Sequence, residues 1–113
     1  LILINMNSIS SALTALFDRI PRRHSLENVI EINAIVTEYD DLLMEIEAVN
    51  PFYEKSIPPF FDELENVSAS IKKSTDNKAS KKIKDQFFDE ASGALKDTMQ
   101  ELLDLYGDGK RTD

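Results

Sequence analysis

Apolar residues recur along this chain at intervals of three and four positions, a spacing that predicts α-helices. The clearest stretch is 25–49, SLENVIEINAIVTEYDDLLMEIEAV, where the apolar repeat runs 3-4-3-4-3. Ser25 is placed to cap this helix, and Asn50-Pro51 is placed to end it. The repeat consists of Val29, Ile32, Val36, Tyr39, Leu43 and Ile46, with Ile35, Leu42 and Val49 widening one flank.

Three further segments have helical periodicity. Residues 7–20 predict a short helix that Pro21 ends, with apolar residues spaced 4-3-4. A third helix follows the prolines at 58 and 59, again with 4-3-4 spacing from Phe60 to Ile71. A fourth covers about 79–106, and Gly107 suits its C-terminal end. We expect a turn within 72–84, with Thr75 or Asp76 as a capping candidate. Residues 72–84 contain no proline or glycine, so one continuous helix from 57 to 106 is the alternative.

The fourth helix carries two apolar edges. One edge comprises Ile83, Phe87, Ala91, Ala94, Thr98, Leu102 and Leu105, and the second comprises Phe88, Leu95, Met99 and Tyr106. Together with the wide face of 25–49, this is more apolar surface than one small bundle can readily cover. We therefore predict a homodimer joined along the helices of 25–49 and 79–106.

Composition fits this helical picture and narrows the chemistry. The 113 residues include three glycines, four prolines and no cysteine. No cysteine means no disulfide, no thiolate zinc site and no cysteine nucleophile, and it fits a reducing compartment, so a cytoplasmic location is expected. No apolar run reaches the roughly 18–20 residues that cross a bilayer, so no membrane partner is expected.

Charge divides the chain into blocks. Residues 27–65 carry one cation and eleven anions, whereas residues 66–84 carry six lysines and one aspartate. The net charge of −8 disfavours nucleic acid, whose binding depends on cation–phosphate contacts. The alternation predicts pairing of the lysine block with the acidic block, either within the chain or between two copies.

An acidic row runs along the predicted helix 25–49. Glu27, Glu31, Glu38, Asp41 and Glu45 fall on one helical face, set apart from the apolar stripe. Like charges four residues apart repel one another, so lysines, a Mg²⁺ ion or a basic partner would offset the cost of the row. We predict that these five residues, with Phe52 and Tyr53, contact a protein partner.

Glu38-x-x-Asp41, followed by LLMEI, resembles the E-x-x-D helix of the all-α nucleotide pyrophosphohydrolases of the MazG-like group. The resemblance implies Mg²⁺-dependent hydrolysis of nucleoside triphosphates, with Glu38 and Asp41 as metal ligands. It covers about a dozen residues. The E-E-x-x-E helix that precedes this motif in the family has no match here, because Glu27 and Glu31 are spaced E-x-x-x-E on the same helix.

Two smaller features complete the candidates. His24, the only histidine, lies in an expected turn with no carboxylate nearby in sequence to orient it. Phe52, Tyr53, Phe60 and Phe61 flank the prolines, where they either cap one end of the core or form an exposed anchor for a partner. Solvent exposure separates these two roles.

The sequence thus predicts a single all-α domain over 1–113, with frayed ends at about 1–6 and 108–113. Its architecture is expected to be an antiparallel helical bundle of three long helices plus a shorter N-terminal helix. The leading function is a non-enzymatic, acidic interaction module of adaptor, immunity, antitoxin or chaperone-like type, without catalytic residues, cofactor or metal, and with a basic protein as partner. The alternative is the Mg²⁺-dependent hydrolase that uses Glu38 and Asp41.

Overall fold

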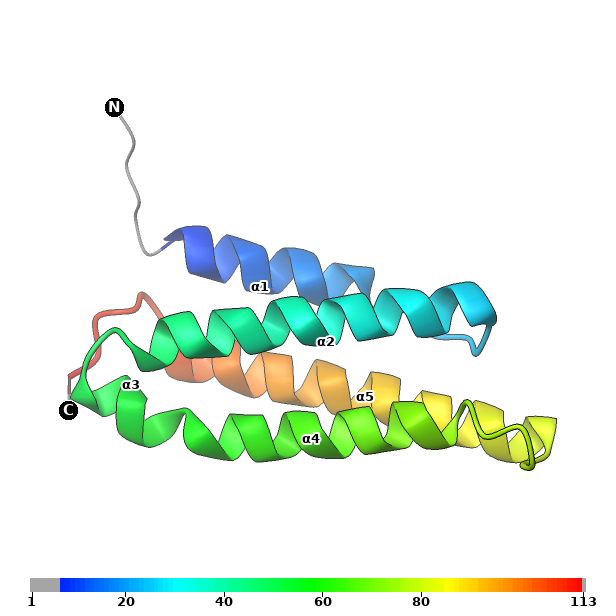
Figure 1. Cartoon of the computed structure of the whole chain (residues 1–113). Helices are drawn as coiled ribbons and strands as arrows, with labels where there is room; N and C mark the ends of the chain where they lie inside the picture. The colour runs from blue at the N-terminus through cyan, green and yellow to red at the C-terminus, as the bar shows by residue number, and fades with distance from the viewer. Residues whose placement is uncertain (1–6, 113) are drawn as a thin grey trace.

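A computed structural model describes residues 7–112, and these form helices and no strands (Figure 1). The expectation that residues 1–6 fray lies outside the described residues. The helices in chain order are α1 (Asn7–Arg19), α2 (Leu26–Glu47), α3 (Pro51–Ser56), α4 (Pro58–Lys73) and α5 (Lys81–Tyr106). The predicted all-helical class is confirmed, and the described chain has five helices instead of the four expected, because the central connection contains α3.

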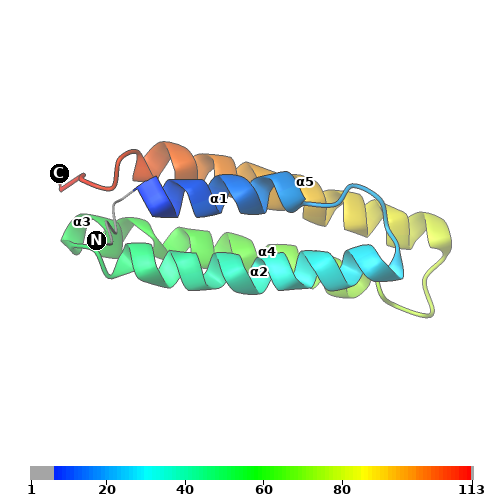
Figure 2. The same cartoon turned by 90° about the horizontal axis from the view of Figure 1, so that it is seen from above.

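Helices α1, α2, α4 and α5 form a two-by-two bundle in which consecutive long helices run in opposite directions. Figures 1 and 2 together place α2 beside α1 and beside α4, with α5 at the opposite corner from α2. Helix α1 covers only part of the length of α2, and the linker 20–25 continues in extended form over the rest (Figure 2). Because α2 occupies a corner of the bundle, its side away from α1, α4 and the core faces solvent (Figures 1 and 2).

Local signals explain where most helices begin and end. Ser25 Oγ accepts a hydrogen bond from the amide of Asn28 at 3.0 Å, as expected for the cap of α2. Helix α5 starts later than expected, because Ser80, and not Thr75 or Asp76, caps it through the amide of Ile83. Gly107 ends α5 with a φ of 58°, a conformation that favours glycine. Helices α4 and α5 are thus separate, joined by 74–80.

The core lies between the four long helices and is continuous. In α2 the side chains of Ile32, Ile35, Tyr39, Leu43 and Ile46 have 0% exposure. In α5 the buried face includes Phe88, Leu95, Met99 and Tyr106, while Ile83 and Ala94 are exposed. The second apolar edge, one of the two surfaces on which the predicted homodimer rested, therefore packs inside a single chain. The core-facing side of α5 is rotated from the first edge, which begins at the exposed Ile83.

Helix α3 closes one end of the bundle. Asn50 Oδ1 accepts a hydrogen bond from the amide of Tyr53 at 3.1 Å, and Pro51 occupies the first turn, where its missing N–H costs nothing. The residues after α5 return to this end, where Asn50 Nδ2 donates to the carbonyl of Arg111 at 2.8 Å. The guanidinium of Arg111 lies 4.9 Å from the centre of the Phe52 ring. Residues 108–112, expected to fray, make these contacts.

Candidate functional site

The acidic row of α2 lies at the surface, as its helical periodicity predicts. Glu27, Glu38, Asp41 and Glu45 are exposed, and Glu31 is half-buried. Helix α1 packs beside this row, so the carboxylates border the seam between the two helices. The side chain that meets them is Arg19, at the C-terminal end of α1.

Arg19 joins two carboxylates of the row. Its Nη2 lies 3.2 Å from Glu31 Oε1, and its Nη1 lies 2.9 Å from Glu38 Oε2. These hydrogen bonds to Glu31 and Glu38 hold the pKa of Arg19 above its ordinary value. For this neutralising role the sequence suggested lysines of 72–84, a Mg²⁺ ion or a basic partner. Arg19 was missed, because only the return of the chain at 20–25 places α1 against α2.

A shallow open groove lies between α1 and α2 beside this ion pair. Glu38, Asp41 and Glu45 line its acidic wall, and Arg19 lies at one side. Its apolar floor consists of Ala12, Ala15, Leu16 and Leu42. Among the ion pairs of the described residues, none involves Asp41 or Glu45. The groove thus combines apolar surface with carboxylates that have no cation of their own.

The geometry does not bring further metal ligands to Glu38 and Asp41. Within residues 7–112, no group of three or more His, Asp or Glu side chains is placed to hold a metal ion. Glu38 already contacts the guanidinium of Arg19. A Mg²⁺ site requires several oxygen ligands around one ion, and this donor set does not supply them.

The aromatic residues of the central connection cap the core. Tyr53 has 0% exposure and Phe60 has 8%, while Phe52 and Phe61 are half-buried against the core. Tyr53 Oη donates to the carbonyl of Tyr106 at 2.9 Å and accepts from the amide of Arg111 at 3.2 Å. Tyr53, predicted at a partner surface, is therefore inaccessible to a partner, and its role here is structural.

The lysine block lies at the opposite end of the bundle, where α4 and α5 extend past α2 (Figure 1). Lys81 Nζ lies 2.9 Å from Asp85 Oδ2. Its hydrogen bond is the main reason that the pKa of Asp85 lies below its ordinary value of 3.8. In the described part of the chain, no lysine of the block forms an ion pair with the acidic row of α2, so the expected pairing within the chain is not present.

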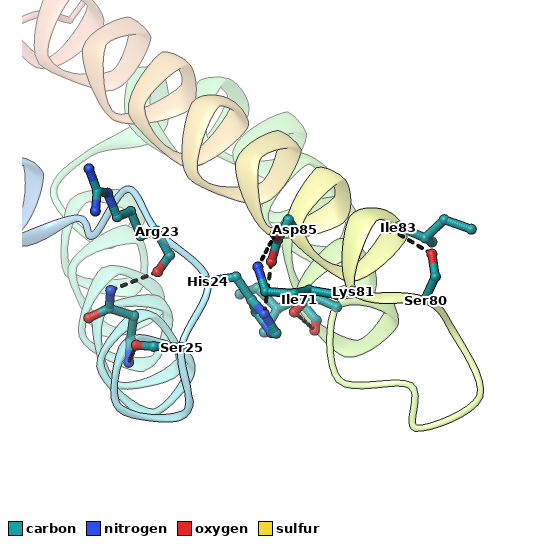
Figure 3. A network of polar contacts seen from close by, with 10 residues as sticks. Arg23, His24, Ser25, Ile71, Ser80, Lys81, Ile83 and Asp85 are labelled. Atoms are coloured by element: carbon teal, nitrogen blue, oxygen red, sulfur yellow. Dashed lines mark hydrogen bonds and ion pairs between the residues drawn. The ribbon is translucent and has the colours of Figure 1, made fainter.

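His24 holds the extended linker against α5. Its Nδ1 lies 3.3 Å from Asp85 Oδ1 (Figure 3). Its ring lies 5.6 Å from the ring of Phe88. A second contact ties the linker down, because Ser92 Oγ donates to the carbonyl of Pro21 at 2.8 Å. The carboxylate that orients His24 is thus 61 positions away in sequence, where sequence reasoning could not find it.

The outward side of α2 carries apolar side chains that our sequence reasoning did not consider. Leu26 is 79% exposed, Ile30 is 64% exposed and Met44 is 52% exposed. All three lie off the core-facing stripe, and they share one helical face because their separations are four and fourteen residues. The signal was present in the sequence as a second, weaker helical stripe.

No protein-family profile, no curated protein and no solved structure matches this chain. Across the described residues, no helix is both long enough and apolar enough to pass through a bilayer.

Proposed function

We propose that this protein is a non-enzymatic interaction module that binds a cationic helix or segment of another protein in the groove between α1 and α2. The observation that carries the proposal is that the groove has both an apolar floor and an acidic wall. Ala15 and Leu42 supply the accessible apolar contact, and Asp41 and Glu45 supply charge that Arg19 does not neutralise. An amphipathic basic helix fits such a groove.

The charge of the molecule supports a basic partner. The chain has a net charge of −8, and three residues of the acidic row, Glu38, Asp41 and Glu45, line the groove. A surface of one sign raises the rate of encounter with a partner of the opposite sign and disfavours nucleic acid. We further propose that the protein acts in the cytoplasm and associates with a second copy of itself.

Binding of a defined probe tests the groove. The probe is a synthetic helical peptide with leucines on one face and lysines on the other, labelled for fluorescence anisotropy. We expect saturable binding that weakens as salt is raised, because the exposed charges are screened. The substitution Glu45→Lys, on the acidic wall, should weaken binding about tenfold, which corresponds to about 1.4 kcal/mol.

The matched control is Glu90→Lys, which makes the same charge change on α5, where Glu90 is exposed. If the peptide detected only net charge, both variants would weaken binding equally, and the groove would not be the site. Binding that Glu45→Lys leaves unchanged would contradict the proposal in the same way. A pull-down from the native host with the same two variants then identifies the partner as a protein that the Glu45→Lys variant fails to retain.

A further inference from the structure

The outward face of α2 has a palindromic pattern of side chains. Centred on Thr37, polar Asn33 and Asp41 lie four residues away on either side, and apolar Ile30 and Met44 lie seven residues away. Leu26 and Ala48 follow at eleven residues. All except Thr37 thus occur as pairs of like polarity about one centre.

Every residue of this face is exposed or nearly so. Leu26, Ile30 and Met44 have exposures of 79%, 64% and 52%. The remaining residues of the face are exposed as well: Asn33, Thr37, Asp41 and Ala48. The spacing from Leu26 to Met44 is 4-3-4-4-3, which keeps the six residues on one side of a helix and suits pairing with another helix. Because α2 occupies a corner of the bundle, neither α1 nor α4 covers this side (Figure 2).

We propose that this face is a contact with a second copy of the chain, in which the two α2 helices run antiparallel with Thr37 at the two-fold axis. In this register Ile30 packs on Met44 of the other copy, and Leu26 packs on its Ala48. Asn33 faces Asp41 of the other copy, where its amide can donate to the carboxylate. Polar residues inside such a seam fix register and orientation.

Charge selects the antiparallel orientation over the parallel one. The first half of α2, residues 26–36, carries two carboxylates, while residues 37–47 carry five. An antiparallel pair sets the less acidic half of each α2 against the acidic half of the other copy. A parallel pair would align the two acidic halves and repel.

The inference deepens the proposed self-association. The groove with α1 lies on a neighbouring side of α2 and shares Asp41 with this face, whereas Ile30 lies outside the groove and Glu45 lies outside the seam. The helix is roughly 33 Å long, so one helical seam buries less than the ~800 Å² per partner of a standard interface. The pair is therefore a weak one. We expect a dissociation constant on the order of 100 µM.

Cysteine cross-linking tests the register directly, because the natural chain contains no cysteine. Thr37→Cys should form a disulfide-linked dimer readily under mild oxidation, because the two copies meet at this residue. Ile30→Cys alone should cross-link slowly, whereas a mixture of the Ile30→Cys and Met44→Cys chains should form the mixed disulfide. The control is Asn66→Cys, an exposed position on α4.

Thr37→Cys cross-linking no faster than Asn66→Cys would overturn the proposal. Rapid cross-linking of Ile30→Cys to itself would overturn the antiparallel register. Circular dichroism of each variant confirms that the helices are intact.

Sedimentation equilibrium provides the second test. The natural chain should shift from monomer to dimer between about 20 µM and 1 mM. Ile30→Glu should weaken association at least about tenfold, because it places a carboxylate beside the acidic half of the other copy. Ile83→Glu, at an exposed isoleucine of α5, should leave it unchanged.

A natural chain that stays monomeric at 1 mM overturns the proposal. The peptide assay separates this failure from failure of the proposed function. Ile30→Glu should still bind the cationic peptide, and Glu45→Lys should still dimerise.

Discussion

The inner and outer faces of α2 both carry large apolar side chains and differ in their surroundings. On the inner face Ile32, Ile35 and Leu43 are fully buried, whereas on the outer face Leu26 and Ile30 are mostly exposed. Both faces have helical spacing of apolar residues. The two faces differ in what they contact, because the other helices of the bundle pack against the inner face and solvent surrounds the outer one.

On this helix the residues that stabilise the fold and the residues that we propose for binding lie on different faces. Burial of the inner face drives folding, so its residues are fixed by packing. The outer side contributes little to the monomer, which leaves its residues free to serve contacts with other molecules. Substitutions on the two faces should therefore act on different measurements.

The largest effect is expected from a cavity on the inner face. Leu43→Ala should lower the free energy of unfolding by about 2–5 kcal/mol, because Leu43 has 0% exposure and its removal leaves a hole in the core. Urea denaturation followed by circular dichroism measures it. The adjacent Met44→Ala is the control, and it should change stability by less than about 0.5 kcal/mol. Equal losses would remove the distinction between the two faces.

A smaller effect is expected from the buried hydroxyl of the inner face. Tyr39 Oη donates to the carbonyl of Thr98 at 3.2 Å, and Thr98 Oγ1 donates to Glu63 Oε1 at 2.6 Å. Tyr39→Phe removes the first contact and keeps the ring. It should cost about 1 kcal/mol near neutral pH, measured by denaturation.

The same hydroxyl gives a pH dependence. Burial raises the pKa of Tyr39 well above its ordinary value of 10.0. Above pH 10 the unfolded chain loses this proton while the folded chain keeps it, so stability falls as pH rises, by up to about 1.4 kcal/mol per pH unit. Tyr39→Phe should make that fall shallower. An unchanged slope in denaturation experiments between pH 9.5 and 11 would show that Tyr39 is not held neutral by burial.

The acidic edge of α2 should show a still smaller effect. Arg19→Ala leaves Glu31 and Glu38 without their cation, yet both pairs are exposed, so the loss should be about 0.5–1 kcal/mol. Added salt should reduce the difference from the natural chain, because it screens the remaining repulsion. A loss that salt leaves unaltered would indicate lost packing of the arginine stem instead of lost charge.

The smallest effect concerns the linker at the lysine-rich end. The pKa of Asp85 is lowered, so its contribution to stability is present above 3.8 and is lost as pH falls below that value. Asp85→Asn should therefore flatten the acid limb of the stability curve slightly. Thermal unfolding between pH 5 and 3 compares the two chains.

The helices themselves could be predicted from sequence because their signals are local. The apolar repeat of 25–49, the Ser25 cap and the Gly107 end depend on neighbours within a few positions. Helix α3 was missed although Asn50-Pro51 is a good helix start, because both residues were interpreted only as the end of the preceding helix. A six-residue helix has too little periodicity to reveal itself otherwise.

The candidate site depended on distant parts of the chain and was predicted only in part. The acidic face followed from periodicity, whereas its neutralisation by Arg19 depends on how α1 folds back along α2. For the same reason His24 lacked an evident partner until α5 brought Asp85 beside it. The core-facing side of α5 was misjudged because two apolar edges compete in the sequence, and only packing against α4 and α1 decides between them.

The most direct test of the central claim is a map of amide chemical shifts on adding the cationic amphipathic peptide to the isotope-labelled protein. The account predicts that the shifts concentrate in residues 12–19 of α1 and 38–45 of α2, while the amides of α5 from 81 to 92 stay in place. Shifts spread evenly over the acidic surface, or confined to other helices, would contradict the claim that the groove between α1 and α2 is the binding site for the peptide.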